Sequence, residues 1–121
     1  MLNKPMNVVS ISQPTYLPYL GFFDKINQSD IFVYFDDVNI SIRSFHNRNK
    51  IKTISGTTWL SVPLNHPHNK KIQNVLISDD PQWKIKHKNL IKTNYEQAKF
   101  FDEYWNDIKK IYDKNWVNLI D

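Results

Sequence analysis

The stretch "SISQPTYLPYLG" combines residue types that can bind a small polar molecule. Its glutamine amide both donates and accepts hydrogen bonds, and its tyrosines offer aromatic faces with hydroxyl groups. Its two prolines restrict the backbone, which pre-organises a loop for a ligand, and its glycine permits a close approach. The binding residues that we expect here are Gln13, Pro14, Tyr16, Tyr19 and Gly21. The alternative is a proline-rich turn whose tyrosines cover the edge of a core.

Two adjacent carboxylates, Asp36 and Asp37, follow the apolar run "IFVYF". Carboxylates at the carboxyl end of a strand can bind a ribose or a metal, or act as a base. Neighbouring side chains point apart, so only one of the two is expected to face a site. The alternative is a pair of solvated acids in a turn.

A basic segment, "SIRSFHNRNKIK", supplies the cationic groups. Guanidinium groups bind phosphate and carboxylate in a bidentate manner, and a neutral histidine suits the same site. If part of the segment is extended, Arg43 and Asn49 share one face, and His46, Arg48 and Lys50 share the other. An anionic small molecule is the expected partner. Nucleic acid is disfavoured, because no groove-reading or RNA-binding signature is present.

Metal and cofactor chemistry receive little support from the sequence. His66 and His68 are spaced so that they could hold a metal, but no third ligand is evident and no metal site is assigned. His87, beside Trp83 on a helical face, is interpreted as a packed structural histidine. The chain lacks the common nucleotide-binding glycine motifs, a G-x-S-x-G element and any cysteine nucleophile, and no cofactor can be named.

The elements that must position these residues begin with a β-strand at residues 8–11 and a helix at residues 20–27. A continuous apolar run at residues 31–35 then predicts a buried strand. Strand, helix and strand within about thirty residues indicate a βαβ unit, in which the two strands are parallel.

The remaining pattern predicts a β-hairpin and two helices. Runs at residues 50–54 and 57–62 flank Ser55 and Gly56, a turn dipeptide, and a further strand is expected at 72–77. Asp80 and Pro81 are typical of a helix N-terminus. The last helix is expected to extend its apolar face to Ile120 without a capping signal, which predicts that further chain follows.

The composition limits the class of protein. A chain of 121 residues with 40% hydrophobic residues is long enough for one α/β domain over 1–121. It has no cysteine and no apolar stretch of membrane-spanning length, so we expect a cytoplasmic protein. The net charge of +4 favours anionic partners only weakly, since much of it is lysine on expected helices.

Four of these elements, in this order, resemble the WbqC-like family. They are "ISQPTYLPYLGFFDKINQSD", "IFVYFDDVN", "RSFHNRNKIKT" and "WLSVPL", and the resemblance covers residues 8–105. Its motif positions correspond to Gln13, Pro14, Tyr16, Pro18, Gly21, Asp36, Asp37, Arg48, Asn49 and Trp59. Tyr19 replaces a common tryptophan and Asn39 a common glutamine.

The resemblance implies a role in bacterial surface-polysaccharide or O-antigen biosynthesis. An aminoacyl (glycyl) or acyl transfer onto a nucleotide-linked amino sugar is the transferase reaction that it implies. Family members continue for about as long again, so the chain corresponds to their N-terminal half. The expected fold is α/β with a Rossmann-like βαβ start, a hairpin excursion and C-terminal helices packed on the sheet.

Under this interpretation three residues are catalytic candidates: Asp36, Asp37 and His46. The substrate-binding candidates are Gln13, Pro14, Tyr16, Tyr19, Gly21, Arg43, Arg48, Asn49, Lys50 and Trp59. The alternative is a non-catalytic ligand-binding module, or a half-subunit that another chain completes. A third hypothesis, a nucleic-acid binder, requires steeply salt-dependent binding.

Overall fold

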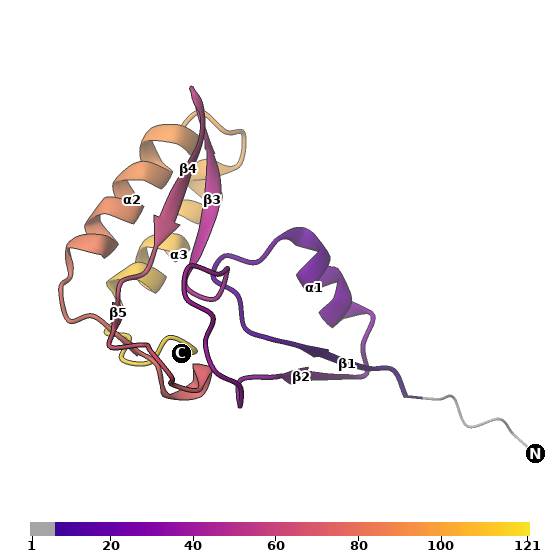
Figure 1. The fold of residues 1–121 in the computed structure, drawn as a ribbon. Helices are drawn as coiled ribbons and strands as arrows, with labels where there is room; N and C mark the ends of the chain where they lie inside the picture. The colour runs from indigo at the N-terminus through magenta and orange to yellow at the C-terminus, as the bar shows by residue number, and fades with distance from the viewer. Residues whose placement is uncertain (1–6) are drawn as a thin grey trace, which may run out of the picture.

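The computed structural model describes residues 7–121, which form three small sheets and three α-helices. The mixture of strands and helices confirms the expected α/β class. Two lobes are visible in Figure 1: a βαβ unit stands to one side of a larger lobe that contains the hairpin and the two C-terminal helices.

The βαβ lobe consists of β1 (Val9–Ser12), α1 (Leu20–Asn27) and β2 (Ile31–Tyr34). The two strands are parallel, with Val9 opposite Ile31, and the predicted helix has the expected bounds. Phe22 of α1 is buried against Phe32 of β2, with ring centroids 5.5 Å apart. The prediction of a buried second strand was wrong, because α1 covers only one face and Ile31 on the other face is 49% exposed.

The larger lobe begins with an antiparallel hairpin of β3 (Arg48–Thr53) and β4 (Gly56–Ser61). The turn was expected at Ser55 and Gly56, but it consists of Ile54 and Ser55. Gly56 has a φ of +135°, a conformation that other residues rarely adopt, so it ends the turn as the first residue of β4.

The prediction of a single strand over residues 72–77 was also wrong. The chain forms a 3-10 helix, η1 (Ile72–Asn74), and only then the short strand β6 (Leu76–Ile77), which pairs with β5 (Leu64–Asn65). Ile72 and Val75 are completely buried and form a core cluster with Ile40. A tight turn buries both side chains on one side, which alternation along a strand cannot do.

Two antiparallel helices complete this lobe, α2 (Gln82–Tyr95) and α3 (Phe101–Asp113). The Asp80 carboxylate accepts a hydrogen bond from the Gln82 amide at 2.9 Å, the contact expected of a capping side chain. Pro81, which was predicted to be the first helical residue, lies at the N-cap position, and α2 begins at Gln82. The expected continuation of the last helix to Ile120 was wrong, because α3 ends at Asp113.

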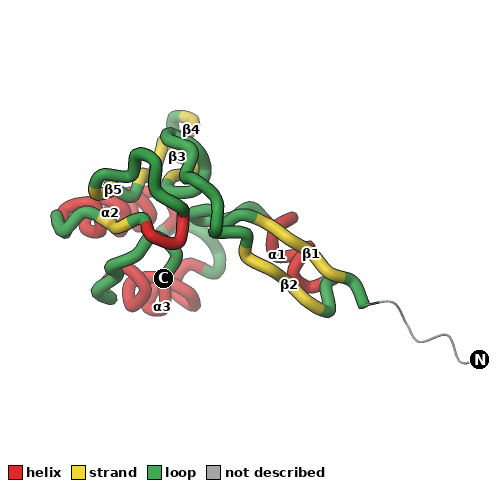
Figure 2. The backbone as a smooth tube through the Cα atoms, turned by 60° about the horizontal axis from the view of Figure 1, so that its bottom comes forward, coloured by secondary structure: helices red, strands yellow, loops and turns green. Residues whose placement is uncertain are grey.

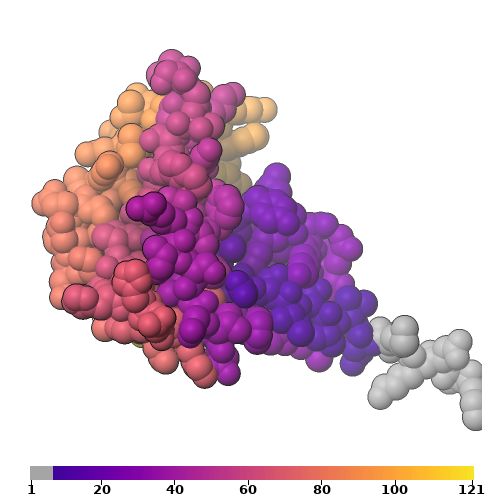
Figure 3. All heavy atoms as spheres, in the orientation of Figure 1, coloured from indigo at the N-terminus to yellow at the C-terminus, as the bar shows by residue number. Residues whose placement is uncertain are grey.

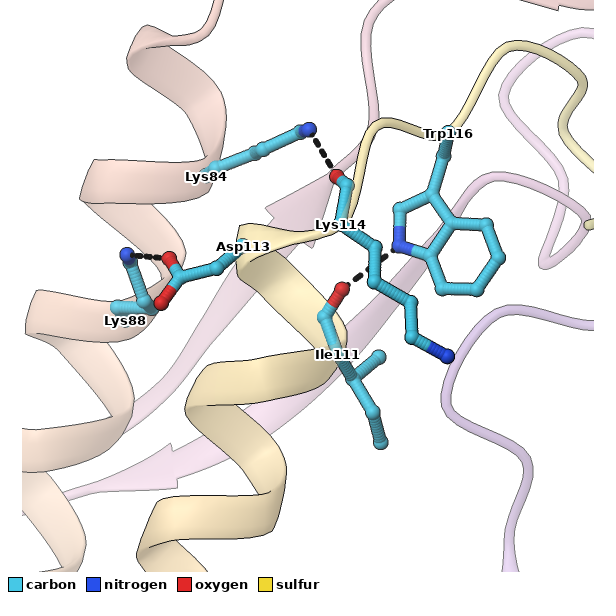
Figure 4. A network of polar contacts seen from close by, with 6 residues as sticks. All are labelled: Lys84, Lys88, Ile111, Asp113, Lys114 and Trp116. Carbon is cyan, nitrogen blue, oxygen red and sulfur yellow. Dashed lines mark hydrogen bonds and ion pairs between the residues drawn. The ribbon is translucent and has the colours of Figure 1, made fainter.

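Side chains from α2 and from the following loop hold this helix end (Figure 4). Lys84 donates to the carbonyl of Lys114, and Lys88 forms an ion pair with Asp113. The Trp116 indole donates to the carbonyl of Ile111 at 2.7 Å. The hydrogen bonds from Lys84 and Trp116 satisfy carbonyl groups at the helix C-terminus, where intrahelical partners run out, and the ion pair joins α2 to the last residue of α3.

The C-terminal helices pack on each other, and α2 packs on β3 of the hairpin. The sheet on which the C-terminal helices pack is that of the hairpin, and Figure 2 shows β1, β2 and α1 extending away from them. The space-filling view shows the indigo βαβ lobe meeting the magenta hairpin region along one side (Figure 3).

Candidate functional site

The segment between β1 and α1, which carries most of the expected binding residues, lies at the junction of the two lobes. Its Tyr16 amide donates to the Phe45 carbonyl at 2.9 Å. From β3, the Asn49 amide group donates to the carbonyl of Leu17 at 2.8 Å and to that of Tyr16 at 3.3 Å. Pro14 is half-buried in the same segment. Asn49 therefore ties the lobes together through backbone groups.

A second contact across the junction joins Gln13 and His46. The His46 ring Nε2 lies 2.8 Å from the Gln13 Oε1, and His46 is only 8% exposed. Burial lowers the pKa of His46, so its ring is neutral at pH 7. With Oε1 as the acceptor, Nε2 carries the proton. Nδ1 is then a bare acceptor, buried and without a hydrogen-bond partner among residues 7–121.

Two basic residues of the segment, Arg48 and Lys50, lie beside Trp59 on the hairpin. The Arg48 guanidinium carbon lies 4.3 Å from the Trp59 ring centroid, and the Lys50 ammonium nitrogen 5.0 Å from it. Lys50 is directly opposite Trp59 in the strand register. The extended part of the segment begins at Arg48, and the preceding residues 42–47 form turns. Arg43 therefore does not belong to the strand face on which Asn49 lies.

Arg48 retains unused donors. It donates to the Arg43 carbonyl, and its Nε is buried with no partner in the described part of the chain. A cleft of about 300 Å³ is lined by both arginines. Two guanidinium groups at one cleft, with an indole and an ammonium group nearby, favour an anion that carries a flat ring.

Tyr16 points into the larger lobe, away from this group. Its hydroxyl lies 2.9 Å from the His87 Nδ1 and also bonds the Tyr112 hydroxyl. Burial lowers the pKa of His87 to about 4, although a hydrogen bond with the Ser61 backbone acts in the opposite direction. Burial also raises the pKa of both tyrosines. The three groups are therefore neutral at pH 7.

An apolar cavity of about 290 Å³ lies beside this polar triad. Its wall includes Tyr16 and Tyr112 together with apolar side chains of α2, α3 and the last residues, among them Trp83, Ile91, Ile108, Ile111 and Trp116. Such a cavity fits the apolar part of a small ligand.

Four expected site residues lie outside this set of contacts. Asp37 forms an ion pair with Lys71, and the half-buried Asp36 accepts a hydrogen bond at its backbone carbonyl. Tyr19 is 75% exposed, and its ring fills the space beside Gly21: a Cβ built there would lie 2.4 Å from the Tyr19 Cε2. The glycine therefore accommodates a tyrosine ring.

Sequence reasoning missed the triad that joins Tyr16 to the two C-terminal helices. His87 was expected to be a packed histidine, and it is 2% exposed. A histidine and a tyrosine on the inner faces of two helices were a signal of a buried polar contact, but their partner is 71 residues from His87 in sequence. No group of three His, Cys, Asp or Glu residues in the described part is placed to hold a metal, and none of its helices has the length and apolar character to cross a membrane.

The model of the WbqC-like protein family matches residues 13–121, and the chain belongs to that family. It is similar to a protein of Mycobacterium tuberculosis named uncharacterized protein Rv1507c. The two are 36% identical over 109 residues, which cover 88% of this chain and 47% of the relative. The chain thus spans about half the length of the curated relative that it matches. No solved structure matches it.

Proposed function

We propose that this WbqC-like protein is part of a cytoplasmic transferase of bacterial surface-polysaccharide or O-antigen biosynthesis. The proposed reaction transfers an aminoacyl (glycyl) or other acyl group onto a nucleotide-linked amino sugar. One observation carries the proposal: Arg43 and Arg48 line one cleft, and the Arg48 guanidinium and the Lys50 ammonium group lie over the Trp59 indole next to it. A nucleoside diphosphate presents the matching chemistry, two phosphates and a flat base.

The phosphate groups are assigned to Arg43, Arg48 and Lys50. The unpartnered Nε of Arg48 supports this assignment, because a buried donor without an acceptor is costly unless a ligand satisfies it. Trp59, which is 38% exposed, offers part of its ring as a stacking surface. Gln13 and Asn49 fix the geometry of the junction through their contacts with His46 and the backbone.

His46 is the proposed base. In the transfer, the amine of the sugar attacks the carbonyl carbon of an activated acyl donor, a C–N bond forms and the bond to the leaving group breaks. The proton that the amine loses passes to a neutral acceptor, and the neutral imidazole of His46 is proposed for that role. Asp36 and Asp37 remain proposed as ligands of a sugar hydroxyl. The apolar cavity beside Tyr16 would hold the apolar part of an acyl donor.

The test is calorimetric titration of the protein with UDP and with a UDP-linked amino sugar. Loss of one charge-assisted contact removes about 1.5–3 kcal/mol of binding free energy, so Arg48→Ala is expected to weaken binding about 10- to 100-fold. Lys109→Ala is the matched control, since it also removes one positive charge, from an exposed position on α3. Equal weakening in the two variants would show that only net charge matters and would refute the site.

A second candidate function is a non-catalytic half-subunit that another polypeptide completes. The specific observation that favours it is an apolar sheet face with no described element on it. In that case UDP binds, but neither acyl transfer nor hydrolysis of an acyl donor is detected until the second polypeptide is added.

A further inference from the structure

The parallel sheet of the βαβ lobe has one face that nothing in the described part of the chain covers. Val9 and Ile31 are partners in the register, and so are Ile11 and Val33. These four side chains alternate with those that face α1, and they are 53%, 49%, 56% and 40% exposed, respectively. We call this quartet the open face.

The opposite face is covered by α1. Phe22 contacts the rings of both Phe32 and Tyr34, and the Lys25 ammonium group donates to the Ser12 hydroxyl. In Figure 1 the helix lies above the two strands, and Figure 2, which brings the underside forward, shows no described element across the near face of the strands.

The outer edge of β1 is open as well. The carbonyls of Val8 and Ser12 accept hydrogen bonds from the β2 side, so the alternating carbonyl of Ile11 points to the opposite edge. No described strand pairs there, and the Lys25 ammonium group bonds the Ile11 carbonyl at 2.8 Å. A lysine is a common means of shielding a free strand edge.

Parallel sheets are stable when helices cover both faces, and two isolated parallel strands are marginal. We propose that the open face and the outer edge of β1 bind an α/β polypeptide segment that adds a parallel strand beside β1 and lays an apolar helix face on the quartet. We identify the segment with the half of the mycobacterial relative's length that this chain does not match.

A second copy of this chain fits less well. With strands of four residues about 4.8 Å apart, the open face measures roughly 13 Å by 10 Å. A stable dimer requires about 800 Å² per partner, several times this area. Two such faces would also pair sheet against sheet and leave both strand edges unpaired. A segment that adds a strand and a helix satisfies the edge and the face together.

The test mixes this 121-residue chain with a recombinant polypeptide that comprises the unmatched half of the mycobacterial relative. We expect a one-to-one complex by light scattering after gel filtration. Ile11→Glu is expected to weaken the association at least tenfold, whereas Ile54→Glu is the matched control, because Ile54 is 90% exposed in the hairpin turn. Circular dichroism of each variant verifies that it is folded, as expected for side chains already exposed.

Hydrogen exchange provides the second measurement. The amides of Val9 and Ile11, which point to the open edge, are expected to gain protection in the complex, and those of the hairpin turn are not. Absence of a complex, equal weakening by the two variants, or a homodimer that Ile11→Glu dissociates would overturn the proposal. Arg48→Ala is expected to leave the association unchanged. Failure of the polypeptide association can therefore be distinguished from failure of the proposed ligand site.

Discussion

The buried histidine of α2 makes the stability of the protein depend on pH in a calculable way. His87 is 2% exposed, and burial lowers its pKa from 6.5 to about 4. In the unfolded chain the ring takes up a proton as the pH falls through 6.5, but in the folded protein it does so only near pH 4. The stabilising contribution is therefore complete above pH 6.5 and is lost progressively as the pH falls toward 4.

The magnitude follows from the two pKa values. Each unit of difference corresponds to about 1.4 kcal/mol, so the free energy of unfolding is expected to fall by about 3 kcal/mol between pH 7.5 and pH 4 on account of His87 alone. A domain has a total stability of about 5–15 kcal/mol, so the effect is a substantial fraction. Burial of His46 lowers its pKa as well and adds a loss in the same direction.

Urea unfolding at a series of pH values from 7.5 to 4 measures this effect, with His87→Asn as the test variant. The variant has no titrating group at this position, so the difference between wild type and variant removes the contributions of His46 and of the carboxylates. His68→Asn, at an exposed loop position, is the control and should retain the full pH dependence. If wild type and His87→Asn lose stability in parallel as the pH falls, the assignment of a neutral buried ring is refuted.

Two further substitutions test local interactions that the structure identifies. Gly21→Ala alone should change the stability little, because the gain in helix propensity is offset by the displacement of the Tyr19 ring. In a Tyr19→Ala background the same change should stabilise the protein by about 0.5–1 kcal/mol, the difference in helix propensity between glycine and alanine. Thermal unfolding of the two single variants and the double variant measures the coupling, and additive effects would contradict the ring contact. Asp80→Ala should cost about 1 kcal/mol through loss of the α2 cap, measured by urea unfolding, whereas an equal loss in Asp79→Ala would argue against capping.

Elements governed by local signals were predictable from the sequence. The bounds of α1 and the Asp80 cap depend on residues close together in the chain, and the parallel pairing of β1 and β2 follows from the length of the connection between them. The 3-10 turn at Ile72 was not predictable, because its short apolar run has the composition of a strand and only the tertiary core selects the turn. The end of α3 likewise depends on Lys84 and Lys88, which lie on another helix.

The candidate site was predictable in its residue types more than in its geometry. Gln13 contacts His46 at the junction, and Arg48 lies over Trp59 on the hairpin, and all four residues lie in segments that the sequence singled out. Tyr16 was expected beside them, yet its hydroxyl bonds groups of α2 and α3. The direction in which a side chain leaves a proline-rich turn depends on backbone angles that the sequence does not specify.

The junction gives the polar motif residues a role that precedes any ligand. Gln13 and Asn49 each reach across the two lobes, so they position the βαβ unit against the hairpin that carries Arg48 and Trp59. The open face lies on that same βαβ unit, and its residue Ile11 is two positions before Gln13 in the chain. A polypeptide that completes the sheet would fix the orientation of this unit and, through Gln13, that of the His46 ring. Binding of the proposed segment is therefore expected to tighten UDP binding, and reciprocity requires UDP to strengthen the association by the same factor.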